Sequence, residues 1–90
     1  METTLDVIRG LSFLQHKHGY RFSMDPVLLA DFVSMRTAKR ILDLGAGSGV
    51  LGLLLAARYP KARATLVELQ RGLHDLSERN IELNAMAPRV

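Results

Sequence analysis

The 90-residue sequence predicts an α/β fold in which part of a parallel sheet follows an N-terminal β-hairpin and a helix. Three observations predict it. A glycine-rich turn, residues 45–49, separates a short apolar run from an apolar helix. A second apolar run, residues 64–69, follows that helix after Pro60, which is typical of a strand–helix–strand unit with parallel strands. Near the N-terminus, Arg9-Gly10 separates two short apolar runs, as a hairpin turn would.

The first elements follow from local signals. The hairpin strands are expected at residues 5–8 and 11–15. Asp25-Pro26 predicts a helix start, with Asp25 as the N-cap and Pro26 at the first helical position. This helix is expected to run to about Met35. Its predicted packing face consists of four apolar residues: Leu28, Leu29, Phe32 and Val33.

The later elements form the predicted core. Residues 41–44 are expected to be a buried strand. Residues 50–59 form a helix that is apolar on nearly every face, so it should be buried on more than one side. Residues 64–69 are expected to be the second parallel strand, and leucines at helical spacing predict a last helix from about Gly72 to Ala85. We divide the chain into a hairpin-plus-helix segment, 1–36, and the first strand–helix–strand–helix part of a larger domain, 37–90.

Composition excludes several classes of protein. The net charge of +3 is mildly basic and falls short of a dedicated nucleic-acid binder. The absence of cysteine excludes disulfides and cysteine zinc sites, and fits a reducing cytoplasm. His16 and His18 flank a cationic lysine without an evident third ligand, so a polar loop is favoured over a metal site. The acidic N-terminus is unlike a signal peptide, and the apolar run 50–57 is too short to cross a membrane.

The glycine turn satisfies two templates. Gly45, Gly47 and Gly49 fit Gly-x-Gly-x-Gly, whereas Gly47, Gly49 and Gly52 fit the Gly-x-Gly-x-x-Gly dinucleotide pattern. The position of the strand separates the two. Because strand residues end at Leu44, the first turn glycine is Gly45, and Gly52 falls inside the helix, where it would allow close packing on the sheet.

Two acidic residues indicate the ligand. Asp43 precedes the turn and would repel a pyrophosphate, but it suits a ligand that carries an ammonium and a sulfonium, such as S-adenosylmethionine. Glu68, near the end of the second apolar run, is placed to accept two hydrogen bonds from a ribose diol. We expect both acids to border a common cleft. The alternative is a tight turn without a ligand. It requires the two acids and the three alternating glycines to occur together by coincidence.

The motifs resemble a known family. Asp43-Leu-Gly-Ala-Gly-Ser-Gly49 resembles motif I of class I S-adenosylmethionine-dependent methyltransferases, and Val67-Glu68-Leu69 resembles their ribose-binding acidic motif. With Gln15 and the stretches 19–30, 68–70 and 78–84, the chain is similar to bacterial tRNA adenine-N6 methyltransferases of the small-domain type. The resemblance spans residues 5–84 in the family's order. The most specific part is Gly-Tyr-Arg-Phe-Ser-x-Asp at 19–25.

The resemblance implies a partial Rossmann-like fold and an enzyme that methylates adenine N6 in RNA, with tRNA as the expected partner. It implies that the turn glycines approach the methionine part of S-adenosylmethionine and that Glu68 binds the ribose. Gln15, Tyr20, Arg21 and Phe22 would belong to a segment that closes over the cofactor. The expected cofactor-binding residues are Asp43, Gly45, Ala46, Gly47, Ser48, Gly49, Glu68, Leu69, Tyr20 and Arg21.

The chain departs from the family in one respect. Such amino-group methyltransferases carry an Asn-Pro-Pro-aromatic motif, whereas the prolines here are Pro26, Pro60 and Pro88. We therefore expect an N-terminal portion of a longer enzyme, inactive alone, that self-associates through uncovered apolar surface. Two alternatives stay open: a non-catalytic cofactor-binding or assembly fragment, and an NAD-type half-domain. Asn80 is either a hydrogen-bonding residue at a helix edge or a residue that bonds loop backbone near the cofactor.

Overall fold

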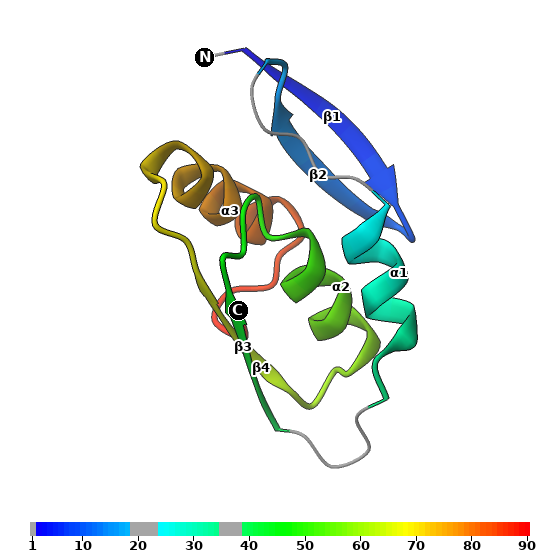
Figure 1. Cartoon of the computed structure of the whole chain (residues 1–90). Coiled ribbons are helices and arrows are strands. Elements are labelled where there is room, and N and C mark those ends of the chain that lie inside the picture. Colours follow the sequence, from blue (N-terminus) through cyan, green and yellow to red (C-terminus); the bar gives the residue numbers. More distant parts are fainter. Residues whose placement is uncertain (1, 19–23, 35–38) are drawn as a thin grey trace.

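A computed structural model of the chain describes residues 2–18, 24–34 and 39–90. The predicted order of hairpin, helix, strand, helix, strand and helix is confirmed (Figure 1). The elements are β1 (Thr3–Ile8), β2 (Leu11–His16), α1 (Asp25–Phe32), β3 (Arg40–Leu44), α2 (Val50–Arg58), β4 (Arg63–Val67) and α3 (Arg71–Leu83). The two-stranded antiparallel sheet β1–β2 is separate from the two-stranded parallel sheet β3–β4.

The hairpin forms where the sequence predicts it. Arg9 and Gly10 connect the strands with φ angles of 51° and 80°, and two successive positive φ angles match the twist of a tight hairpin. Ile8 pairs with Leu11 across the turn. Phe13 of β2 is completely buried and joins the hairpin to the main core.

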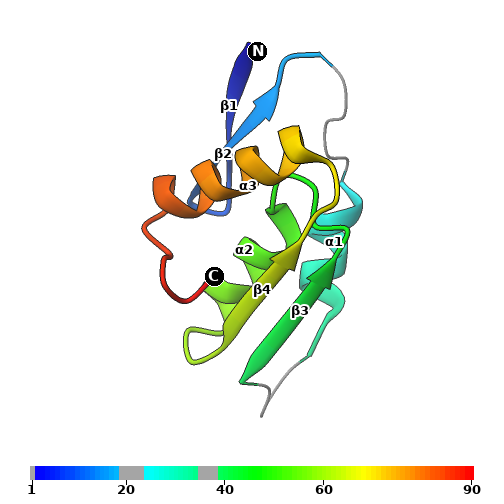
Figure 2. The same ribbon diagram turned by 90° about the vertical axis from the view of Figure 1, so that its left-hand side faces the viewer.

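Parallel pairing brings the ends of β3 and β4 to one edge. Leu44 pairs with Val67, so the glycine turn and Glu68 emerge side by side. Helix α2 lies between this sheet and α1 (Figures 1 and 2). The predicted packing role of Gly52 is confirmed, because a Cβ atom there would collide with Leu66 Cδ2. The predicted burial of α2 on more than one side is also confirmed, since residues 52–56 are all buried.

The prediction that residues 41–44 form a buried strand is wrong for one face. Ile41 and Asp43 are half-buried beneath α2, but Leu42 and Leu44 are 63% and 72% exposed. Val67 on the neighbouring strand is 46% exposed. Successive side chains of a strand point to opposite faces, and α2 covers only one of them. The sheet therefore presents an apolar outer face, defined here by Leu42, Leu44 and Val67.

Helix α1 differs most from expectation. Met24, not Asp25, is the N-cap, and the Met24 side chain makes no capping hydrogen bond. The helix ends at Phe32 because Val33 is extended, so the predicted end near Met35 is too late. Its buried residues are Val27 and Ala30, whereas three residues of the predicted packing face, Leu28, Leu29 and Phe32, are 58%, 47% and 86% exposed. The small side chain of Ala30 lets α1 approach α2. A search for large apolar residues in the sequence does not identify this face as the buried one.

The other element ends move by one or two residues. Strand β4 ends at Val67, whose carbonyl accepts hydrogen bonds from the glycine turn, so Leu69 lies beyond the strand. Helix α3 begins at Arg71 and ends at Leu83, slightly before the predicted bounds. Within residues 2–18, 24–34 and 39–90, each helix is too short or too polar to cross a membrane.

Candidate functional site

Backbone hydrogen bonds fix the glycine turn against the end of β4. The amides of Gly45 and Ala46 both donate to the Val67 carbonyl, at 2.8 Å and 3.0 Å. Gly45, Gly47 and Gly49 have φ angles of 71°, 60° and 94°, in the left-handed region that favours glycine. The three alternating glycines of the sequence are therefore required by the backbone of this turn.

The turn glycines face different surroundings. A Cβ atom added to Gly45 would meet no other atom of residues 2–18, 24–34 and 39–90 within 4 Å, so these residues leave space for a ligand to approach the backbone. A Cβ on Gly49 would instead meet Leu66 Cδ1 at 3.2 Å and Ser77 Cβ at 3.4 Å. Gly49 thus permits close packing at the start of α2, while Gly45 opens outward.

Glu68 is held by two backbone amides. Its Oε1 accepts a hydrogen bond from the Gly47 amide at 2.8 Å, and its Oε2 accepts one from the Gln70 amide at 2.9 Å. Both amides, that of Gln70 most strongly, lower the pKa of Glu68 below its usual value. The carboxylate is therefore ionised at neutral pH and fixed in orientation. Each oxygen keeps acceptor capacity for a further donor, such as a hydroxyl of a diol.

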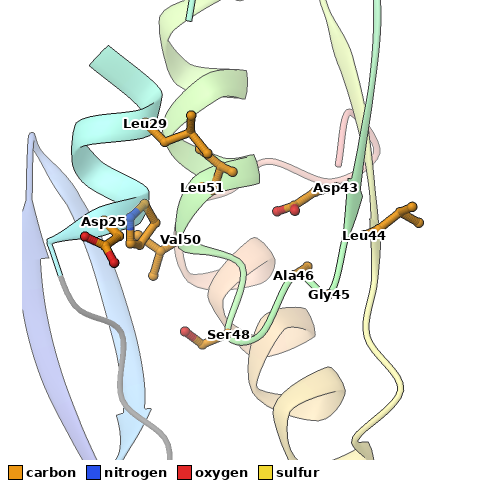
Figure 3. A pocket seen from close by; sticks show the side chains of 10 residues that line it. Asp25, Leu29, Asp43, Leu44, Gly45, Ala46, Ser48, Val50 and Leu51 are labelled. Carbon is orange, nitrogen blue, oxygen red and sulfur yellow. The ribbon is translucent and has the colours of Figure 1, made fainter. Parts of the chain in front are cut away.

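Asp43 lies on the other side of the turn. Figure 3 shows its side chain pointing from β3 towards α2, while Leu44 points the opposite way. Its Oδ2 is buried and has no hydrogen-bond partner within the described chain. Burial raises the pKa of Asp43, the Gly52 amide opposes this, and the negative charge of Glu68 adds to the increase. A buried acceptor without a partner is unusual, and it fits a site completed by a cationic or hydrogen-bonding ligand.

The raised pKa of Asp43 predicts a pH-dependent stability. The folded chain binds this proton more tightly than the unfolded chain, so stability falls as pH rises through the interval between the two pKa values. Asp43→Asn removes that effect. We expect urea unfolding to show a gain in stability for Asp43→Asn at pH 7 that shrinks below about pH 4, near the ordinary aspartate pKa. A gain of equal size at both pH values would contradict the assignment.

A pocket of about 280 Å³ opens between the turn and the start of α1 (Figure 3). Its lining residues are Asp25, Pro26, Leu29, Asp43, Leu44, Gly45, Ala46, Ser48, Val50 and Leu51. Asp25 and Leu29 are absent from the predicted site, because their sequence pattern indicated a helix cap and a packing face. The signal that could have found Asp25 is its place as the last residue of the specific stretch 19–25.

Glu68 borders a second hollow of about 390 Å³ rather than the Asp43 pocket. Its lining residues are Glu68, Leu69, Arg71, His74, Asp75 and Glu78. Leu69 is 97% exposed there. The two acids therefore border different hollows, and the prediction that both border a common cleft is wrong. The glycine turn links them, because Ala46 lines the first hollow and the Gly47 amide holds the acid of the second.

The remaining predicted residues have different outcomes. Tyr20, Arg21 and Phe22 lie outside the described residues. Gln15 is 3% exposed, and its Nε2 donates to Asp6 Oδ2 at 2.6 Å, which places it inside the hairpin. For Asn80 the loop-bonding alternative is confirmed, because its Nδ2 donates to the Ser48 carbonyl at 2.8 Å.

Comparisons with known proteins agree with this geometry. The methyltransferase small domain family matches residues 22–90. A Shewanella putrefaciens protein named tRNA1(Val) (adenine(37)-N6)-methyltransferase is 39% identical over 72 residues, covering 80% of this chain and 30% of its own length. A Yersinia pestis protein of the same name is 37% identical over 67 residues, covering 73% and 27%. The chain thus spans less than a third of the length of these relatives.

Solved structures share the fold. The crystal structure of P. horikoshii TYW2 in complex with MeSAdo aligns with a TM-score of 0.79 and 25% identity, covering 97% of this chain and 33% of that one. A putative transferase from Pyrococcus horikoshii aligns with the same TM-score and identity, covering 97% and 34%. The partial Rossmann-like fold that the family resemblance implies is confirmed. With its family match over residues 22–90, the chain belongs to the methyltransferase small domain family.

Proposed function

We propose that this chain binds S-adenosylmethionine along the glycine turn. The observation that carries the proposal is the ionised Glu68, held by the Gly47 and Gln70 amides directly beside the turn. Such a carboxylate suits a ribose diol, whose two hydroxyls each donate one hydrogen bond. The buried, unpartnered Oδ2 of Asp43 adds an acceptor that fits an ammonium or sulfonium.

The two hollows divide the cofactor between them in this proposal. The methionine part would lie in the Asp43 pocket, where Asp25 supplies a second carboxylate and Gly45 an open approach. The ribose would lie on Glu68, with the adenine against the exposed Leu69. Residues 37–90 would hold the cofactor, while residues 1–36, with Tyr20 and Arg21, would close over it.

We propose that this chain is the N-terminal portion of a longer enzyme that methylates adenine N6 in RNA, with tRNA as the substrate, in the cytoplasm. The names of the relatives support this activity, and family membership supports the chemistry. When bound, S-adenosylmethionine would supply the methyl group: the substrate amine would attack the sulfonium methyl carbon, the sulfur–methyl bond would break, S-adenosylhomocysteine would leave and the amine would lose a proton to solvent. The residues described here bind and orient the cofactor, and positioning contributes much of the rate in such a step. No catalytic residue is assigned in this chain, which we expect to be inactive alone.

Calorimetry with S-adenosylhomocysteine and NAD tests the cofactor assignment. We expect S-adenosylhomocysteine to bind with a dissociation constant on the order of micromolar, and NAD to bind at least about a hundredfold more weakly. The affinity for NAD should be lower because its anionic pyrophosphate would lie beside the carboxylate of Asp43 and be repelled by it. Equal binding of both ligands, or tighter binding of NAD, would favour the dinucleotide alternative.

The apolar outer face supports a second proposal, that the chain self-associates. Leu42, Leu44 and Val67 are exposed together on one face of a two-stranded sheet, and apolar patches of this kind are covered in stable proteins. Such contact between two copies would suit an assembly fragment as well as a portion of an enzyme.

Light scattering during size-exclusion chromatography tests this association. We expect a mass that rises with concentration for the unaltered chain and that falls towards the monomer for Leu42→Lys, because lysine cannot be buried unpaired. Leu28→Lys on α1 is the control, since Leu28 has a similar exposure, 58% against 63%, but lies away from this face. A monomer at all concentrations would overturn the proposal.

A further inference from the structure

Two asparagines pair with strand β2: Asn80 of α3 and Asn84, the C-cap residue of that helix. Asn80 Oδ1 accepts a hydrogen bond from the Leu14 amide at 2.6 Å, and its Nδ2 donates to the Leu14 carbonyl at 3.0 Å. One helical turn later, Asn84 Oδ1 accepts from the Ser12 amide at 2.8 Å, and its Nδ2 donates to the Ser12 carbonyl at 2.7 Å. Each side-chain amide thus substitutes for one residue of a neighbouring strand, on the β2 edge that β1 does not use.

Asn80 makes one contact that Asn84 does not. Its Nδ2 also donates to the Ser48 carbonyl at 2.8 Å, inside the glycine turn. Asn80 is 0% exposed and Ser48 is 4% exposed, so these bonds are shielded from water. Ser48 directly follows Gly47, whose amide holds the carboxylate of Glu68. A single buried side chain therefore connects the hairpin, α3 and the turn.

We infer that Asn80 is a positioning residue that couples the hairpin to the cofactor turn. It fixes the Ser48 carbonyl, and through it the Gly47 amide that orients Glu68. Cofactor binding and pairing of the hairpin with α3 then depend on each other, because a ligand that favours the ordered turn also favours the ordered Asn80 side chain. This inference rests on the proposed function, since it takes the turn to be the cofactor site.

The matched variants Asn80→Ala and Asn84→Ala test the coupling. Both remove the pairing of an asparagine with one residue of β2, but only Asn80→Ala releases the turn. We expect calorimetry to show at least about a tenfold loss of affinity for S-adenosylhomocysteine in Asn80→Ala and less than about a twofold loss in Asn84→Ala. Circular dichroism confirms that each variant is folded at the temperature of the titration. Equal losses in the two variants would overturn the coupling.

Hydrogen exchange in the unaltered chain tests the same inference without a variant. Saturating S-adenosylhomocysteine should slow exchange of the Leu14 amide more than that of the Ala64 amide. The Ala64 amide donates to the Arg89 carbonyl, away from both the hairpin and the turn, and responds to global stabilisation alone. Equal slowing at both amides would overturn the coupling but not the cofactor site. Failure of the unaltered chain to bind S-adenosylhomocysteine would overturn the proposed function, and the coupling with it.

Discussion

Replacing Glu68 with alanine is expected to weaken S-adenosylhomocysteine binding at least about a hundredfold, because hydrogen bonds to a charged group contribute about 1.5–3 kcal/mol each. The variant loses both diol contacts. It also releases the Gly47 and Gln70 amides, which hold the backbone around the ribose. Because the pKa of Glu68 is lowered, the carboxylate stays ionised across the neutral range, and the loss should be the same at pH 6 and pH 8.

Glu82→Ala is the matched control for this effect. Glu82 is an exposed residue of α3 that lines neither hollow, so its replacement removes one negative charge without touching the site. Calorimetry should show less than about a twofold change in affinity for this variant, in keeping with the small effect of exposed charges. A loss of less than about threefold in Glu68→Ala would mean that the carboxylate does not bind the ribose.

Gly49→Ala is expected to destabilise the fold by about 2–3 kcal/mol, a large part of the stability of a small domain. Two costs combine at this position. The φ angle of 94° strains any residue with a Cβ atom, and that atom would lie 3.2 Å from Leu66 Cδ1 and 3.4 Å from Ser77 Cβ. Both neighbours belong to the packing of α2 against β4 and α3, so relief of the contact would disturb the core. Urea unfolding measures the loss.

Gly10→Ala separates these two costs. Gly10 has a similar φ angle of 80° in the hairpin turn, but apart from its chain neighbours no atom of the described residues lies within 4 Å of the position of its Cβ. We expect the free energy of unfolding of this variant to fall by about 1 kcal/mol, because only backbone strain destabilises it. Equal losses in Gly10→Ala and Gly49→Ala would show that the contacts around Gly49 are loose and that crowding contributes nothing there.

Elements encoded by local signals could be predicted from the sequence. Arg9-Gly10 between apolar runs, and glycines directly after a strand, specify backbone angles that few other residues adopt. Helix α1 was harder because leucine and phenylalanine usually face the core, whereas here Val27 and Ala30 do so. Which face of a short helix is buried depends on its partner helix, and the sequence of α1 does not contain that information.

The candidate site divides in the same way. Asp43 and Glu68 could be predicted because each directly follows or precedes a recognisable strand end. The bond between Asn80 and Leu14 joins residues 66 positions apart, so no spacing rule reveals it. The approach of Asp25 to the glycine turn likewise depends on how α1 packs beside α2. Contacts between segments that are distant in the sequence can be identified only from the three-dimensional structure.

A crystal structure of the chain with S-adenosylhomocysteine tests the central claim most directly. We expect the ribose hydroxyls within hydrogen-bonding distance of Glu68 Oε1 and Oε2, and the methionine ammonium in the pocket bordered by Asp43. The ligand would then cross the turn beside Gly45, where a Cβ atom would meet no atom of the described part of the chain within 4 Å. A ligand bound elsewhere on the chain, with Glu68 still engaged only by the amides of Gly47 and Gln70, would contradict the account.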